Sequence, residues 1–224
     1  MNTEQARFNM IEQQIRHWDV LDNHILELLG LVKREDFCAP AHRALAFVDM
    51  ELPIGDVELG QVMLAPRVEA RMLQDLAVQK HEKVLEIGTG SGYMAALLGH
   101  RASQVISLEL DAGLVEQARS NLARAGVSNV DVRQADGAQS SSWIDGPFDV
   151  IVLSGSVAQI PQELLMQLKV GGRLGAILGD EPQMRAMFAT RVASGSANDF
   201  QRVTPWDSNA PRLLHFAEPS RFHF

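Results

Sequence analysis

The segment 83–98, KVLEIGTGSGYMAALL, places three glycines two residues apart between a short apolar run and a helical pattern. Glycine is favoured in such a turn because the chain must bend sharply and bring backbone N–H groups close to a ligand. Gly88, Gly90 and Gly92, with Thr89 between the first two, therefore predict a cofactor-binding turn between a strand and a helix. The alternative is a tight turn that binds no ligand. In that case the conformational entropy that three glycines lose on folding would be offset by no interaction.

Short runs rich in β-branched residues alternate with helical patterns from about residue 83 onward. The runs are KVLEI at 83–87, QVISLEL at 104–110, NVDVRQA at 129–135, FDVIVL at 148–153 and RLGAIL at 173–178. This alternation predicts an α/β fold with a mostly parallel sheet and helices on both faces. The stretches 84–87 and 150–153 are almost wholly apolar, which is typical of central strands covered on both sides.

The residues before this core predict a helical extension. Helical patterns at about 4–17 and 22–31 lead into an irregular stretch rich in proline and glycine. We therefore expect residues 1–80 to form an N-terminal helical extension that ends in a loop, packed on a cofactor-binding domain at 81–224.

Capping residues place two further helices. Asp111 is expected to cap a helix that Gly126 closes and that buries Leu114, Ala118, Leu122 and Ala125. Another helix is expected to begin at Pro161 and to end before Gly171. Near the end of the chain we expect a turn at 194–199 and a late strand at 211–217, as parts of an antiparallel hairpin.

Acidic residues follow three neighbouring strands at their carboxyl ends, where open α/β sheets bind ligands. Glu109 ends the second strand, 21 residues after Gly88, where its carboxylate can accept hydrogen bonds from both hydroxyls of a ribose. Asp136, followed by Gly137, ends the third strand and can accept a hydrogen bond from an adenine amino group. Glu86, inside the first strand, is expected to point toward a cationic end of the cofactor.

A dinucleotide is the competing ligand for this site. Its fingerprint requires glycine or alanine at the sixth position of G-x-G-x-x-G, where close packing of helix and strand leaves no room for a larger residue. Tyr93 occupies that position here, whereas Gly92 fits the spacing of methyltransferases. The spacing therefore favours S-adenosylmethionine over NAD.

Composition excludes several classes of partner. Twenty basic against 28 acidic residues give a net charge of −8, which repels polyanions, so no nucleic acid partner is expected. The single cysteine, Cys38, allows no internal disulfide and predicts a cytoplasmic protein.

No run of 18 apolar residues and no signal segment is found, so no membrane association is expected. The seven histidines lack ligand spacing, so no metal is predicted.

Five motifs spread over nearly the whole chain carry a family resemblance. They are NMIEQQIRHWDVLD at 9–22, VKREDF at 32–37, ELPIG at 51–55, VLEIGTGSGY at 84–93 and IPQELLMQLKVGGRL at 160–174. Together they resemble the protein-L-isoaspartate O-methyltransferase family. The resemblance implies a seven-stranded class I (Rossmann-like) methyltransferase fold and S-adenosylmethionine held by Gly88, Gly90, Glu109 and Asp136. It also implies a protein or peptide substrate, methylated on the α-carboxylate of an isoaspartyl residue.

The loop at 60–70, GQVMLAPRVEA, departs from that family's pattern. The family typically has a hydroxyl-bearing run such as Thr-Ile-Ser before the proline, and Leu64 stands where its serine is expected near the substrate carboxylate. We therefore expect a divergent branch with weak or absent activity on ordinary isoaspartyl peptides. Pro66 and Arg67 follow in the same loop, and the Arg67 guanidinium is a candidate ligand for the acceptor carboxylate. The ending NAPRLLHFAEPSRFHF also differs from the family.

No catalytic residue is predicted, because a carboxylate acceptor is already ionised at neutral pH and needs no general base. The segment LSGSV at 153–157 lacks the Asn/Asp-Pro-Pro-aromatic turn that goes with amino methylation of bases. Ser154 and Ser156 in that segment either border the acceptor pocket or satisfy turn backbone. A different class of function stays open: a methyltransferase fold that binds the cofactor but serves as a binding or regulatory module.

Overall fold

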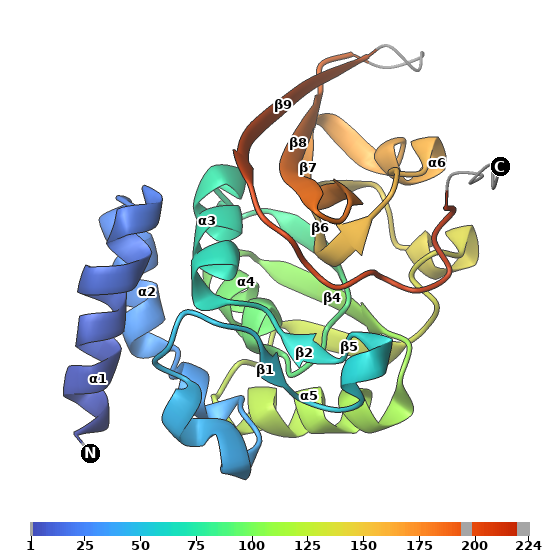
Figure 1. Ribbon diagram of the computed structural model, residues 1–224. Coiled ribbons are helices and arrows are strands. Elements are labelled where there is room, and N and C mark those ends of the chain that lie inside the picture. The colour runs from blue at the N-terminus through green and yellow to red at the C-terminus, as the bar shows by residue number, and fades with distance from the viewer. Residues whose placement is uncertain (1, 194–198, 219–224) are drawn as a thin grey trace, which may run out of the picture.

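A seven-stranded sheet forms the centre of the computed structural model, which describes residues 2–193 and 199–218 (Figure 1). The strand order is β5-β4-β3-β6-β7-β8-β9. The strands are β3 (Lys83–Ile87), β4 (Gln104–Glu109), β5 (Val130–Gln134), β6 (Phe148–Val157), β7 (Leu168–Asp180), β8 (Gln183–Arg191) and β9 (Phe200–Asp207). The first five pair in parallel, and β8 and β9 are antiparallel. The expected mostly parallel seven-stranded sheet is confirmed.

The two most apolar strands lie at the middle of the sheet, as predicted. In the pair β3·β6, Val84 lies opposite Val150 and Leu85 opposite Ile151, and all four side chains are fully buried. Alternate residues of a strand point to opposite faces, so Val84 packs into one hydrophobic core and Leu85 into the other. The sheet is therefore covered on both faces.

Helices cover the first face. They are α3 (Pro66–Leu76), α4 (Tyr93–Arg101) and α5 (Ala112–Arg124). The Asp111 side chain caps α5 by accepting a hydrogen bond from the Leu114 N–H, as predicted, and Gly126 follows the helix with a φ of +71°. Three of the predicted apolar positions of α5 are buried, but Ala125 is exposed because the helix ends before it. The second face is covered by α6 (Gln162–Leu165), a 3₁₀ turn at Ser140–Trp143 and Phe216.

The N-terminal residues form the expected helices. The first runs from α1 (Thr3–Met10) through a π-helical turn at Ile11–Ile15 and a 3₁₀ turn at Arg16–Trp18, and α2 covers Asn23–Leu31. Figure 1 shows both on the outer side of α3 and α4. Short 3₁₀ turns and a two-stranded hairpin connect them to α3; these are Arg34–Asp36, Pro40–Leu45, β1 (Leu52–Pro53), Val57–Leu59 and β2 (Val62–Met63). The division at residue 80 stays a prediction, and α3, which precedes it, packs directly on β7.

Two expectations for the second half of the chain are wrong in extent or position. The helix after Pro161 is a single turn, because Leu168 already pairs with Phe148 and the chain continues as β7. Residues 211–217 form no strand; Arg212 makes one isolated bridge to Ser156. The antiparallel hairpin exists, but its second strand is β9. The turn expected at 194–199 lies almost wholly outside the described residues.

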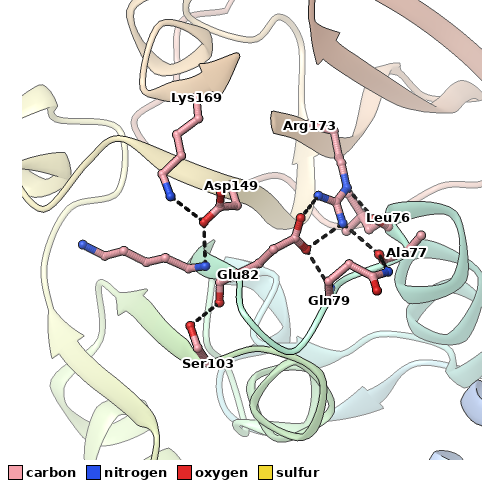
Figure 2. Close-up of polar contacts among 9 residues, drawn as sticks. Leu76, Ala77, Gln79, Glu82, Ser103, Asp149, Lys169 and Arg173 are labelled. Carbon is pink, nitrogen blue, oxygen red and sulfur yellow. Dashed lines mark hydrogen bonds and ion pairs between the residues drawn. The ribbon is translucent and has the colours of Figure 1, made fainter. Parts of the chain in front are cut away.

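An ion-pair network joins the strands at the amino edge of the sheet (Figure 2). Arg173 of β7 makes a two-pronged ion pair with Glu82 just before β3, and also donates to the carbonyls of Leu76 and Ala77 at the end of α3. Nearby, Asp149 of β6 accepts from the Lys83 N–H at 2.9 Å and from Lys169 Nζ at 2.8 Å. The amino edge of the sheet is thus held together by side-chain contacts.

Candidate cofactor and acceptor site

A pocket of about 250 Å³ lies at the carboxyl edge of the sheet, at the ends of β3, β4 and β5. Its lining includes five of the residues that the sequence singled out, namely Gly88, Gly90, Glu109, Asp136 and Gly137. It also includes the hairpin loop around Gly60 and a segment near the C-terminus. Sequence motifs that are far apart along the chain thus meet in one hollow.

The glycine turn takes a conformation that other residues rarely adopt. Gly88, Gly90 and Gly92 have φ angles of +93°, +52° and +85°. Gly88 and Gly90 line the pocket, whereas Gly92 caps α4 and packs closely on α5: a Cβ there would lie 3.3 Å from Ala118 Cβ. Two glycines therefore line the pocket, and the third brings two helices together.

Glu109 is held rigidly at the pocket wall by three backbone N–H groups. Its Oε2 accepts from the Gly90 N–H at 2.8 Å, and its Oε1 accepts from those of Leu110 and Asp111 at 2.9 and 3.1 Å. The carboxylate thereby also supports the glycine turn. Since a carboxylate offers about four acceptor positions, it retains capacity for a ligand hydroxyl.

Asp136 is oriented by its own turn and by a distant histidine. Its Oδ1 accepts from the Ala138 N–H at 3.0 Å, and its Oδ2 lies 2.8 Å from His215 Nδ1. Burial acts to raise the pKa of this carboxyl, but the hydrogen bonds from Ala138 and His215 outweigh it and lower the pKa below its ordinary value. Asp136 is therefore ionised at neutral pH and can accept a hydrogen bond.

Glu86 and Thr89 lie behind the pocket wall rather than on it. Glu86 is fully buried, and its two oxygens accept from Ser154 Oγ at 2.8 Å and Ser107 Oγ at 2.6 Å. Burial raises the pKa of Glu86 to about 7, although both serine hydrogen bonds act to lower it. The Thr89 hydroxyl lies 2.6 Å from that of Ser107. Ser154 does line the pocket, so it connects Glu86 to the ligand space.

The three residues of the expected substrate loop lie in different surroundings. Leu64 lines a separate small cavity next to Ser154, and Pro66 is the buried first residue of α3. The Arg67 guanidinium is 2.8 Å from Asp49 Oδ2 and lies over the Trp18 ring at 4.7 Å. Arg67 is thus engaged away from the pocket, and it is absent from the residues that line it.

The segment after β9 supplies pocket residues that sequence reasoning did not assign to the site. Arg212, Leu213, Leu214 and Phe216 all line the pocket. The chain runs back across the sheet there (Figure 1), and the Leu213 N–H donates to the Ser156 carbonyl at 2.9 Å. The apolar residues within PRLLHFA are the sequence signal for this segment, although their pattern predicts a strand and the structure has none there.

Within the part of the chain that the structure describes, no three His, Cys, Asp or Glu side chains converge as metal ligands do. Likewise, none of the described helices has the length and apolar character needed to cross a bilayer.

The fold and the site together define a class of protein. A glycine turn after the first parallel strand, with carboxylates after the next two, is the arrangement of an S-adenosylmethionine-dependent methyltransferase with the class I, Rossmann-like fold. Comparison with known proteins gives the family. The profile described as protein-L-isoaspartate(D-aspartate) O-methyltransferase (PCMT) matches residues 5–203. The chain belongs to this family and is an S-adenosylmethionine-dependent O-methyltransferase.

Individual relatives agree with this assignment. Protein-L-isoaspartate O-methyltransferase 1 of Syntrophobacter fumaroxidans is 41% identical over 181 residues, covering 80% of this chain and 82% of the relative. The enzyme of Methanoculleus marisnigri is 40% identical, covering 77% of each chain. A solved structure of a protein of this family from Plasmodium falciparum, in complex with S-adenosyl-L-homocysteine, superposes with a TM-score of 0.75 at 18% identity, covering 92% of this chain and 97% of that one. At that identity the likeness confirms the fold alone.

Glu109→Ala is expected to weaken S-adenosylmethionine binding by about 1–3 kcal/mol, through loss of charged hydrogen bonds to the ribose. Isothermal titration calorimetry measures this directly. Glu116→Ala is the matched control, because Glu116 is exposed on α5 and outside the pocket. Tighter binding of NAD than of S-adenosylmethionine by the wild-type protein would contradict the site assignment.

Proposed function

We propose that this enzyme methylates the α-carboxylate of isoaspartyl residues, or a related carboxylate, in proteins and peptides. The family match over residues 5–203 is the observation that carries the proposal. The relatives named above carry protein-L-isoaspartate O-methyltransferase in their own names. We also propose a cytoplasmic location, which the single, buried Cys38 supports, and neither a nucleic acid nor a membrane partner.

The pocket residues fit the cofactor. Glu109 and Asp136 present acceptor oxygens to a ligand that carries a ribose diol and an adenine amino group. Gly88, Gly90 and Gly137 keep the wall close to the backbone, and the buried Glu86 lies behind it on the side where a sulfonium would be stabilised by negative charge. We propose these residues, with Thr89 and Gly92 as structural support, as the cofactor site.

The chemistry requires alignment rather than proton transfer. When bound, S-adenosylmethionine supplies a methyl group that passes to a carboxylate oxygen as the carbon–sulfur bond breaks, leaving S-adenosylhomocysteine and a methyl ester. The protein aligns the acceptor and excludes water from the pocket. A second cavity of about 500 Å³ shares Gly60, Val62 and Arg212 with the cofactor pocket and offers room for a peptide.

Release of S-adenosylhomocysteine tests the proposal. Wild-type enzyme is incubated with an isoaspartyl peptide, the matching aspartyl peptide and small carboxylic acids. We expect weak turnover on the isoaspartyl peptide, because Leu64 replaces the family's serine, but turnover above that on the aspartyl control. Cofactor binding without turnover on any of these acceptors would favour the alternative, a binding or regulatory module that has kept the cofactor site.

Leu64→Ser is expected to raise kcat/KM on the isoaspartyl peptide by roughly 5- to 100-fold, because a hydroxyl there adds a hydrogen-bond donor for a buried carboxylate. Steady-state kinetics at pH 7 measures the change. Leu31→Ser, at an exposed position of α2, is the control. An unchanged kcat/KM for Leu64→Ser would show that this loop does not limit acceptor binding.

A further inference from the structure

Glu69 is a buried acid that the cofactor site does not use. It lies in the first turn of α3, with only 5% of its surface exposed. Its Oε2 has no hydrogen-bond partner among the described residues. Most buried carboxyls have a partner, so an unpartnered one indicates a site that is completed by something else.

The carboxyl faces a small cavity beside the cofactor pocket. The cavity measures about 10 Å³, close to the volume of roughly 10–15 Å³ that one water-sized oxygen requires. Leu64, Val68 and Met72 make its walls largely apolar, whereas Glu69 and Ser154 are its polar residues. Ser154 lines the cofactor pocket as well, so the two spaces share this residue.

The surroundings of Glu69 keep its carboxyl protonated at neutral pH. Burial raises its pKa to about 8, against the opposing effect of Arg34 and with a smaller contribution from Glu86. The Arg34 guanidinium donates to the carbonyls of Ala46, Met50 and Leu64, whereas its Nε has no partner among the described residues. Tyr93 and Cys38 also lie within electrostatic reach of Glu69. A protonated carboxyl is a hydrogen-bond donor.

We propose that Glu69 is a specificity-determining residue that binds the methyl acceptor as a neutral acid. One oxygen of the acceptor carboxylate enters the small cavity and accepts a hydrogen bond from the Glu69 carboxyl, while the other faces the cofactor pocket beside Ser154. Glu69, on α3, thereby supplies the acceptor carboxylate with the hydrogen-bond donor that the Leu64 side chain lacks. The inference rests on the proposed function, because it assumes a carboxylate acceptor.

This arrangement has a definite dependence on pH. Below pH 8 the Glu69 carboxyl is protonated and donates to the acceptor in a charge-assisted hydrogen bond. Above pH 8 it ionises, and two facing carboxylates repel one another. KM for the acceptor is therefore expected to rise by about tenfold per pH unit above 8, with kcat little changed.

Two variants with different chemistry test the proposal, with an N-acetylated isoaspartyl peptide that contains no His, Lys or Cys. Glu69→Gln keeps a donor that does not titrate, so its KM should stay constant between pH 7 and 9.5. Glu69→Val removes the donor, and its KM should rise about tenfold or more at every pH. Adding Leu64→Ser to Glu69→Val should lower KM again, because the new hydroxyl faces the same cavity. Glu163→Gln, exposed on α6, is the control.

Readouts other than turnover exclude a merely structural role. Calorimetry should give unchanged S-adenosylhomocysteine affinity for both Glu69 variants. The melting temperature of Glu69→Val should equal or exceed that of the wild type, because a buried unpartnered acid is removed; a structural role predicts a fall.

The outcomes separate the two proposals. Wild-type turnover with a KM independent of pH, and unchanged in both variants, would overturn the role of Glu69 and leave the cavity as a water site only. No wild-type turnover on any carboxylate would overturn the proposed function itself, and the inference with it.

Discussion

Gly90→Asp is expected to abolish binding of S-adenosylmethionine and S-adenosylhomocysteine, with a loss of at least ~100-fold, or about 2.8 kcal/mol. Gly90 lines the pocket, and its N–H donates to Glu109 Oε2. A Cβ there would already lie 3.1 Å from Ile54 Cδ1, so an aspartate side chain must project into the ligand space. It would also place a second carboxylate next to Glu109. Calorimetry with both ligands measures the loss.

The control separates loss of the site from strain in the backbone. Gly126 has a comparable positive φ of +71°, and a Cβ there meets nothing within 4 Å. Aspartate tolerates this left-handed conformation better than most residues. Gly126→Asp should therefore fold and bind the cofactor as the wild type does. Undiminished affinity in Gly90→Asp would mean that the cofactor binds elsewhere.

The meeting of the proposed cofactor residues in one pocket could be predicted from the sequence, because each part of this pocket is encoded locally. The glycine turn, Glu109 and Asp136 each follow a strand whose apolar pattern is plain, and parallel strands bring their carboxyl ends to one edge. Tyr93 is fully buried as the first residue of α4, at the position where a dinucleotide-binding turn requires glycine or alanine. Its presence there correctly predicted a cofactor other than a dinucleotide. Short-range patterns and one rule of topology were sufficient for this part of the site.

The remaining parts of the site depend on contacts between distant segments. Nothing near His215 in sequence indicates that it reaches Asp136, 79 residues away. The Arg67 guanidinium is directed by Asp49 and Trp18, which lie in separate turns of the N-terminal region. The helix after Pro161 ends early because Leu168 pairs with β6. In each case a tertiary contact outweighed the local pattern.

Arg173→Met is expected to lower the free energy of unfolding by about 3–5 kcal/mol, because it leaves Glu82 as a buried charge without its partner. Glu82 is only 7% exposed, and Arg173 holds both of its carboxylate oxygens (Figure 2). The same guanidinium donates to Leu76 O at 2.6 Å and Ala77 O at 2.9 Å, so its removal also frees the end of α3 from β7. Urea denaturation monitored by circular dichroism measures the loss.

Two further variants test the cause of this loss. Arg185→Met removes an arginine of β8 whose pair with Asp207 is exposed, so it should change stability by less than about 1 kcal/mol. Adding Glu82→Gln to Arg173→Met removes the uncompensated charge, and the double variant should regain part of the lost stability. A double variant no more stable than Arg173→Met would assign the loss to the α3 carbonyls instead. In either case cofactor affinity should stay unchanged, because the network and the cofactor pocket lie at opposite edges of the sheet.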